Sequence, residues 1–236
     1  MKNTIINKQI INKISNALGE LNNEVIFVGG ATVSLYINDE AAEDVRPTKD
    51  IDISVSVATI NELEDIRERL ASKGFLQSAE LDVICRFKFE DILVDVMNTN
   101  PISWAPANKW FIKGFENMEG IKIEQNTIQI MPFNYFLASK FTAYEDRGGN
   151  DPRFSHDIED ITYILDNRKD WENLLINEKD EEVKSYIIKN LKLIKENSKF
   201  QEAFLGNLFY ESAEERFKLI LNKIDSVLNY FSTTLK

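Results

Sequence analysis

The sequence is poor in the residues that build disulfides and sulfur- or nitrogen-based metal sites. Its 236 residues include one cysteine, Cys85, and one histidine, His156. A single cysteine excludes an intramolecular disulfide and a cysteine-based metal site. A lone histidine near the expected start of a helix is more often a capping or surface residue than a catalyst, so we do not assign His156 as a general base. A reducing, cytoplasmic location fits this composition.

Long apolar runs and a basic half are also missing. No stretch approaches the about 20 apolar residues of a membrane-spanning helix, and the apolar run at Ile5–Ile6 is too short for a signal peptide. Up to Met131 the chain carries 13 Lys and Arg against 20 Asp and Glu, and the remainder carries 15 against 19. We therefore expect no membrane contact and no strong non-specific binding to nucleic acid. A local basic groove for a tRNA end stays open.

The most informative stretch that is present is an alternating strand, which begins at Asp50. One face carries Ile51, Ile53, Val55 and Val57, and the other carries Asp50, Asp52, Ser54 and Ser56. The two aspartates lie roughly 7 Å apart along such a strand, so they repel each other unless a cation neutralises them. An all-oxygen pair suits Mg²⁺, which also takes ligands from a phosphate, with Mn²⁺ as the alternative ion.

A glycine pair precedes this strand by about twenty residues. The apolar run Val25–Val28 leads directly into Gly29-Gly30, and residues 31–37 are expected to form a short helix. Backbone N–H groups at such a place can face a phosphate without interference from a Cβ. A glycine pair after a strand is weak evidence alone, and the Asp-x-Asp strand that follows strengthens it.

A third carboxylate lies in a predicted hairpin over residues 83–97, with Glu90-Asp91 at its tip. Asp95 is flanked by Val94 and Val96 in the second strand of this hairpin. An aspartate there is costly unless it is paired or bound to a metal. It could also be a charge that protects an edge strand from aggregation, but the two earlier aspartates favour the functional interpretation.

These features together resemble the nucleotidyltransferase superfamily of the DNA-polymerase-beta type, and most closely its AbiEii-like, abortive-infection and toxin-type bacterial members. The resemblance covers roughly residues 20–168. The matching stretches are Phe27 to Ala31, Arg46 to Asp52, Cys85-Arg86, Val94 to Met97, Lys140, Arg147 to Gly149, and Ser155 to Asp160.

The resemblance implies a role for each matching motif. Gly29 and Gly30 would grip the triphosphate of an NTP, while Asp50 and Asp52 would bind Mg²⁺. Asp95 would help to bind metal and would activate the acceptor hydroxyl. Many members follow the glycine pair directly with Thr or Ser, whereas here Ala31 precedes Thr32, which leaves open whether Thr32 helps to hold phosphate.

Several cations are candidate partners of the nucleotide. Arg46 and Lys49 lie in or near the loop that enters the metal strand and could direct phosphate. Arg86 points away from the face of Cys85 and could reach either the nucleotide or the acids. Lys140 and Arg147 share one helix face, because they are seven residues apart.

The partner of Lys140 and Arg147 has two candidates. One is the triphosphate, and the other is Asp157 or Asp160 on the next expected helix. We expect both to apply in series, with an acid orienting a cation that faces phosphate.

The predicted fold class is α+β. We expect a catalytic domain with a mixed sheet and flanking helices at 1–131, and a helical bundle at 132–236 that completes the nucleotide cleft. The expected strands are 25–28, 50–57, the hairpin, 121–123 and 128–131, and the expected helices are 4–20, 31–37, 60–73, 133–146, 155–166, 181–196, 199–209 and 212–232.

The function expected from this resemblance is Mg²⁺-dependent transfer of a nucleoside monophosphate to an acceptor hydroxyl. The acceptor could be a tRNA 3′ end, a protein or a small molecule, and the protein could be a toxin or phage-defence component with a cognate antitoxin. The alternative is a non-catalytic module that binds nucleotide or a partner and retains the fold. The intact set of three carboxylates argues against that alternative.

Overall fold

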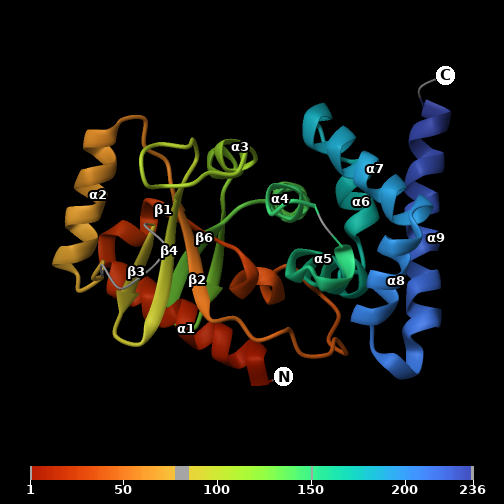
Figure 1. Ribbon diagram of the computed structural model, residues 1–236, viewed down its shortest axis with the longest axis horizontal. Coiled ribbons are helices and arrows are strands. Elements are labelled where there is room, and N and C mark those ends of the chain that lie inside the picture. The colour runs from red at the N-terminus through yellow and green to blue at the C-terminus, as the bar shows by residue number, and fades with distance from the viewer. Residues whose placement is uncertain (1, 78–84, 150, 235–236) are drawn as a thin grey trace. The chain divides into compact units, whose positions relative to one another are not determined.

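The computed structural model describes residues 2–77, 85–149 and 151–234. These residues divide into two compact units (Figure 1). The first comprises Met1–Ser34 and Asp44–Phe136, and the second comprises Leu35–Glu43 and Leu137–Lys236. The sequence placed the domain boundary after residue 131 and did not assign residues 35–43 to the second unit.

The first unit is built on a mixed six-stranded sheet with the strand order β3-β4-β2-β1-β6-β5. β2 runs parallel to β4, whereas β1 with β2 and β3 with β4 are antiparallel. The predicted α+β class is therefore confirmed. The strands are β1 (Val25–Val28), β2 (Asp50–Val55), β3 (Arg86–Phe89), β4 (Ile92–Asn98), β5 (Glu119–Ile123) and β6 (Asn126–Ile130). The predicted hairpin turns at Glu90-Asp91, and its expected first residue, Val83, lies outside the described residues.

Three α-helices accompany this sheet in the described residues: α1 (Lys2–Leu18), α2 (Ile60–Ser72) and α3 (Phe111–Glu116). A capping box begins α2, in which the Thr59 side chain accepts from the backbone of Glu62 and the Glu62 side chain accepts from that of Thr59. The helix expected at 31–37 is instead a 3₁₀ helix, Gly30–Leu35. Shorter 3₁₀ segments lie at Gly19–Asn23, Pro152–Phe154 and Tyr210–Ser212.

The loop that enters β2 is tied to the start of α1. The carboxylate of Asp44 accepts from the backbone N–H groups of Asn3 and Thr4 at 2.6 and 2.9 Å. Further along the loop, the Thr48 hydroxyl donates to Asn7 Oδ1 at 3.1 Å. The first N–H groups of a helix have no acceptors within the helix. Asp44 supplies acceptors for two of them and thereby fixes the loop to α1.

The second unit contains the helical bundle expected from the sequence. Its helices are α4 (Phe133–Asp146), which starts in the first unit, α5 (His156–Asn167), α6 (Trp171–Ile176), α7 (Glu181–Glu196), α8 (Ser198–Asn207) and α9 (Ala213–Thr234). Ser155 begins α5 as its N-cap, as predicted, with its hydroxyl accepting from Ile158. Among the helices in the described ranges, none combines the length and the apolar character needed to cross a membrane.

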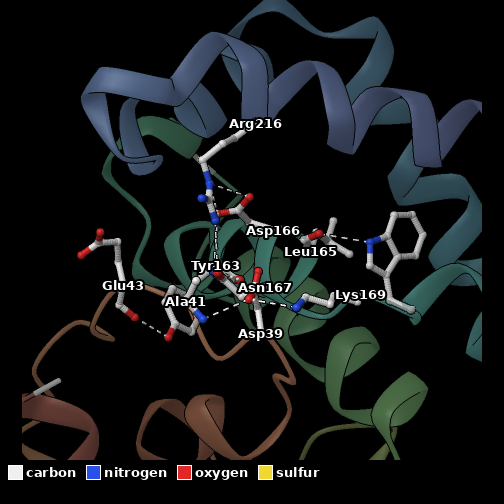
Figure 2. Close-up of polar contacts among 10 residues, drawn as sticks. Asp39, Ala41, Glu43, Tyr163, Leu165, Asp166, Asn167, Lys169 and Arg216 are labelled. Carbon is white, nitrogen blue, oxygen red and sulfur yellow. Dashed lines mark hydrogen bonds and ion pairs between the residues drawn. The ribbon is translucent and has the colours of Figure 1, made fainter.

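Residues Leu35–Glu43 join the helical unit through hydrogen bonds to α5 (Figure 2). The backbone N–H of Asp39 donates to the carbonyl of Asn167 at 3.1 Å. The Tyr163 hydroxyl donates to the carbonyl of Glu43 at 2.7 Å. In the chain, this segment lies between Gly29-Gly30 and β2.

Candidate functional site

The sheet register places the three aspartates on one face. Asp50 and Asp52 are two residues apart on β2, so their side chains point the same way. Asp52 is the direct partner of Asp95 across the parallel β2–β4 pair, and paired residues on adjacent strands share a face. The alternation in the sequence therefore predicted the shared face.

Arg86 lies among these acids and contacts two of them. It is the cross-strand partner of Asp95. Its Nε donates to Asp95 Oδ1 and its Nη2 to Asp95 Oδ2, both at 2.7 Å, while Nη2 also donates to Asp50 Oδ2 at 3.1 Å. The hydrogen bonds and charge of Asp95, together with the charge of Asp50, raise the pKa of the Arg86 guanidinium against the opposing effect of burial. The sequence left two partners open for Arg86, the nucleotide and the acids. In this structure Arg86 contacts the acids.

The glycine loop is in direct contact with the acid strand. Gly29 has a φ of +76°, and a Cβ there would overlap the Asp52 carboxylate. Only glycine leaves this space open in that conformation. Thr32 is fully buried, and its hydroxyl donates to the carbonyl of Gly29 at 2.9 Å. The Thr32 hydroxyl therefore holds the loop itself, and a contribution of Thr32 to phosphate binding stays a prediction.

Arg46 lies against the second glycine of the loop. A Cβ at Gly30 would lie 2.5 Å from Nη2 of Arg46 and 3.0 Å from Cγ2 of Thr48. Lys49 is exposed beside Asp50. The loop before β2 therefore brings a guanidinium to the glycine pair, a position that suits an anion. Motif spacing alone did not distinguish Arg46 from its neighbours.

The donor set fits a divalent cation at two of the three acids. Asp50 and Asp52 are half-buried carboxylates on one strand face, which is the oxygen chemistry that Mg²⁺ prefers. Both oxygens of Asp95 already accept from Arg86. Within the described ranges, no group of three or more His, Cys, Asp or Glu side chains is arranged to hold a metal ion. A metal centre formed by all three carboxylates stays a prediction, and Asp50 and Asp52 are the pair that we expect to hold the ion.

Cys85, adjacent to Arg86, is buried as expected. Burial, with a contribution from the charge of Asp95, raises the pKa of its thiol to about 11. Cys85 is therefore a neutral thiol at physiological pH and is unsuited to act as a nucleophile.

A second charged cluster connects α4 and α5 in the helical unit. The ammonium of Lys140 lies 2.8 Å from Asp160 Oδ2 and 3.8 Å from Asp157 Oδ1. Arg147 pairs with the other oxygen of Asp157. The side chains of Lys140, Asp157 and Asp160 are at most 6% exposed, whereas that of Arg147 is 68% exposed. Both cations are therefore paired with the acids of α5, which was one of the two candidates from the sequence. Their contact with a triphosphate stays a prediction.

His156 lies at the surface, as expected. Its side chain is 75% exposed, and its Nδ1 lies 3.1 Å from a carboxylate oxygen of Glu159. This contact is local to the start of α5.

Comparisons with known proteins identify a matching family. The sequence model of one protein family matches residues 15–235, and this family is described as "Nucleotidyl transferase AbiEii toxin, Type IV TA system". No curated protein matches the chain.

Two solved structures show similarity at low sequence identity. An antigenic nucleotidyltransferase-like protein from Paracoccidioides brasiliensis is 15% identical with a TM-score of 0.49, over 84% of this chain and 91% of that one. ANT(2")-Ia, solved in complex with adenylyl-2"-tobramycin, is 13% identical with a TM-score of 0.37, over 92% of this chain and 97% of that one.

Proposed function

The chain belongs to the AbiEii nucleotidyltransferase family, and we propose that it transfers a nucleoside monophosphate from an NTP to an acceptor hydroxyl in a Mg²⁺-dependent reaction. One observation carries this proposal: the Asp52 carboxylate lies against Gly29 of the glycine loop. A metal-binding acid and a phosphate-binding loop in contact are what a metal–triphosphate complex requires.

The residues of the first unit divide the work of binding. Asp50 and Asp52 would hold the cation, with Mn²⁺ as the alternative to Mg²⁺. When bound, the cation neutralises phosphate charge and orients the α-phosphate. Gly29 and Gly30 leave room for phosphate oxygens at the backbone, and Arg46, with its guanidinium at Gly30, would add a cation for the pyrophosphate that leaves.

Asp95 is proposed to receive the proton of the acceptor hydroxyl. Its oxygens each accept a guanidinium N–H from Arg86, and a carboxylate oxygen has a second acceptor site. Arg86 thereby fixes the orientation of Asp95 on the face that carries Asp52. A proton acceptor must lie within hydrogen-bond reach of the hydroxyl, and a fixed carboxylate meets this need better than a mobile one.

Contributions of the helical unit are proposed on the family resemblance. Lys140 and Arg147 are the residues that the resemblance assigns to nucleotide binding, with Asp157 and Asp160 in support. The ion pairs among these four residues favour a structural contribution as well. Stability and nucleotide affinity of variants separate the two roles.

The acceptor and the partner are the least defined parts of the proposal. A tRNA 3′ end, a protein hydroxyl and a small molecule all supply a suitable hydroxyl. The family's description as a toxin of a type IV toxin–antitoxin system supports a cognate antitoxin, and the resemblance to toxin-like members favours RNA among the acceptors. The net charge of −11 favours a compact acceptor over a long nucleic acid.

Transfer assays with each of the four NTPs, labelled at the α-phosphate, test the proposal. Each reaction would contain Mg²⁺ and total tRNA, a protein extract or a panel of hydroxylated small molecules. Label should enter one acceptor class with the wild type, and Asp50→Asn and Asp52→Asn should abolish it. Asp91→Asn is the matched control, because its side chain is 91% exposed at the hairpin tip. Undiminished transfer by Asp52→Asn would contradict the proposed site.

A further inference from the structure

We propose that Arg86 is the internal counter-ion of the acidic face, which holds Asp95 at all times and holds Asp50 until a divalent cation binds. This inference rests on the proposed metal site at Asp50 and Asp52. It assigns Arg86 a positioning role among the acids, one of the two partners that the sequence left open for it.

The three hydrogen bonds of Arg86 are unequal. The two to Asp95 are both 2.7 Å long and form a bidentate pair, whereas the single bond to Asp50 is 3.1 Å long. Bidentate guanidinium–carboxylate pairs are the stronger kind. Burial follows the same order, since the side chain of Asp95 is 11% exposed and that of Asp50 is 36% exposed. Asp50 is therefore the acid that can exchange Arg86 for another cation at the smaller cost.

The charges on this face are net negative and favour a bound cation. Three carboxylates and one guanidinium carry a formal charge of −2, since Cys85 is neutral with a pKa raised to about 11. Arg46, in the loop before β2, adds a positive charge beside Gly30, whereas Lys49 and Lys88 are exposed, where water screens their charge. One Mg²⁺ or Mn²⁺ would offset the remaining negative charge while Arg86 keeps its pair with Asp95.

Without the ion, Arg86 is the cation that the structure shows in contact with two of these acids. Removing one partner of a buried pair leaves the other charge uncompensated, which destabilises a protein strongly. The same removal eliminates a positive charge that repels an incoming metal ion. Loss of Arg86 should therefore weaken the metal-free fold and strengthen metal binding, two effects of opposite sign.

Thermal melting and Mn²⁺ titration of Arg86→Ala test both effects. The metal-free variant, in EDTA, should melt lower than the wild type by on the order of 5–10 °C. Calorimetry should show Mn²⁺ binding about tenfold tighter, and saturating Mn²⁺ should recover much of the lost melting temperature. Lys88→Ala is the matched control, since Lys88 shares the strand and the face of Arg86 and is exposed. It should change neither quantity.

The outcomes that overturn the inference are distinct from those that overturn the function. An unchanged metal-free melting temperature in Arg86→Ala, or Mn²⁺ binding equal to or weaker than the wild type's, would overturn the counter-ion role. Wild-type protein that binds no Mn²⁺ would overturn the proposed metal site, while the metal-free melts would still decide whether Arg86 stabilises the acids. If Arg86→Ala does not fold, the double variant Arg86→Ala/Asp95→Asn should fold, because the uncompensated charge is gone; failure of this variant to fold would also overturn the inference.

Discussion

The carboxylate of Asp52 occupies the space in which a side chain on Gly29 would begin. This contact follows from the register of the sheet, since Val28, the last residue of β1, is the direct partner of Asp52 on β2. The chain therefore turns into the glycine loop at the level of the second acid. The glycine loop and β2 are therefore packed against each other, so a substitution in one should disturb the other.

Gly29→Ala should be far more damaging than Gly30→Ala. At position 29 alanine must adopt a positive φ, which costs about 1–2 kcal/mol, and it must also displace the Asp52 carboxylate. Gly30 lacks a positive φ, and only the flexible end of Arg46 and the methyl group of Thr48 lie close to a Cβ there. Denaturant unfolding should show Gly29→Ala destabilised by about 2 kcal/mol or more, and Gly30→Ala by less than about 1 kcal/mol. Equal losses would contradict the contact between loop and acid.

Lys140→Ala should cost much more stability than Arg147→Ala. Lys140 is buried between two buried aspartates, so its loss leaves uncompensated charge and should cost about 3–5 kcal/mol. Arg147 is 68% exposed, and its pair with Asp157 should contribute at most about 1 kcal/mol. Denaturant unfolding of both variants measures the difference.

Nucleotide binding then separates the structural role of Lys140 from a phosphate contact. The variant Lys140→Met/Asp160→Asn removes one charge of each sign and should recover part of the lost stability. If Lys140 also contacts the triphosphate, calorimetry with a non-hydrolysable NTP should show binding weakened by about 1.5–3 kcal/mol in this variant. Wild-type affinity would confine Lys140 to the ion pair.

The contribution of Asp44 should be lost in acid. Although burial raises the pKa of Asp44, the hydrogen bonds from Asn3 and Thr4 outweigh this and hold the pKa below its ordinary value. The ionised carboxylate therefore stabilises the fold fully above the unfolded pKa, and this contribution declines as the pH falls through the lower folded pKa. At pH 7, Asp44→Asn should lose about 1 kcal/mol of unfolding free energy. Relative to the wild type, this difference should be constant above about pH 5 and shrink below about pH 4; a difference independent of pH would contradict the capping role.

The sequence was sufficient to predict features that repeat locally. Alternation predicted β2 and the shared face of its acids, and periodicity predicted helices such as α7 to within a residue or two. The short helices α3 and α6 were missed, because six residues are too few to show a helical period.

The contacts that define the candidate site depend on distances along the chain that periodicity does not encode. The pair between Arg86 and Asp95 depends on the register of the β3–β4 hairpin, so the sequence showed only that Arg86 could reach the acids. The link between Asp39 and Asn167 (Figure 2) joins backbone groups 128 residues apart, and backbone atoms carry no sequence signal. The sequence did not show the hydrogen bond of the buried Thr32 hydroxyl either, because its acceptor is also a backbone atom, the carbonyl of Gly29.

The central claim is that the acid face transfers the nucleotidyl group and releases pyrophosphate. Parallel reactions with the same NTP labelled at the α- or at the γ-phosphate test this most directly, in wild type and in Asp52→Asn. We expect the α-label to be found on the acceptor and the γ-label in pyrophosphate, with Mg²⁺ required and with both signals lost in Asp52→Asn. Transfer of the γ-label to the acceptor, or α-label transfer that persists in Asp52→Asn, would contradict the account.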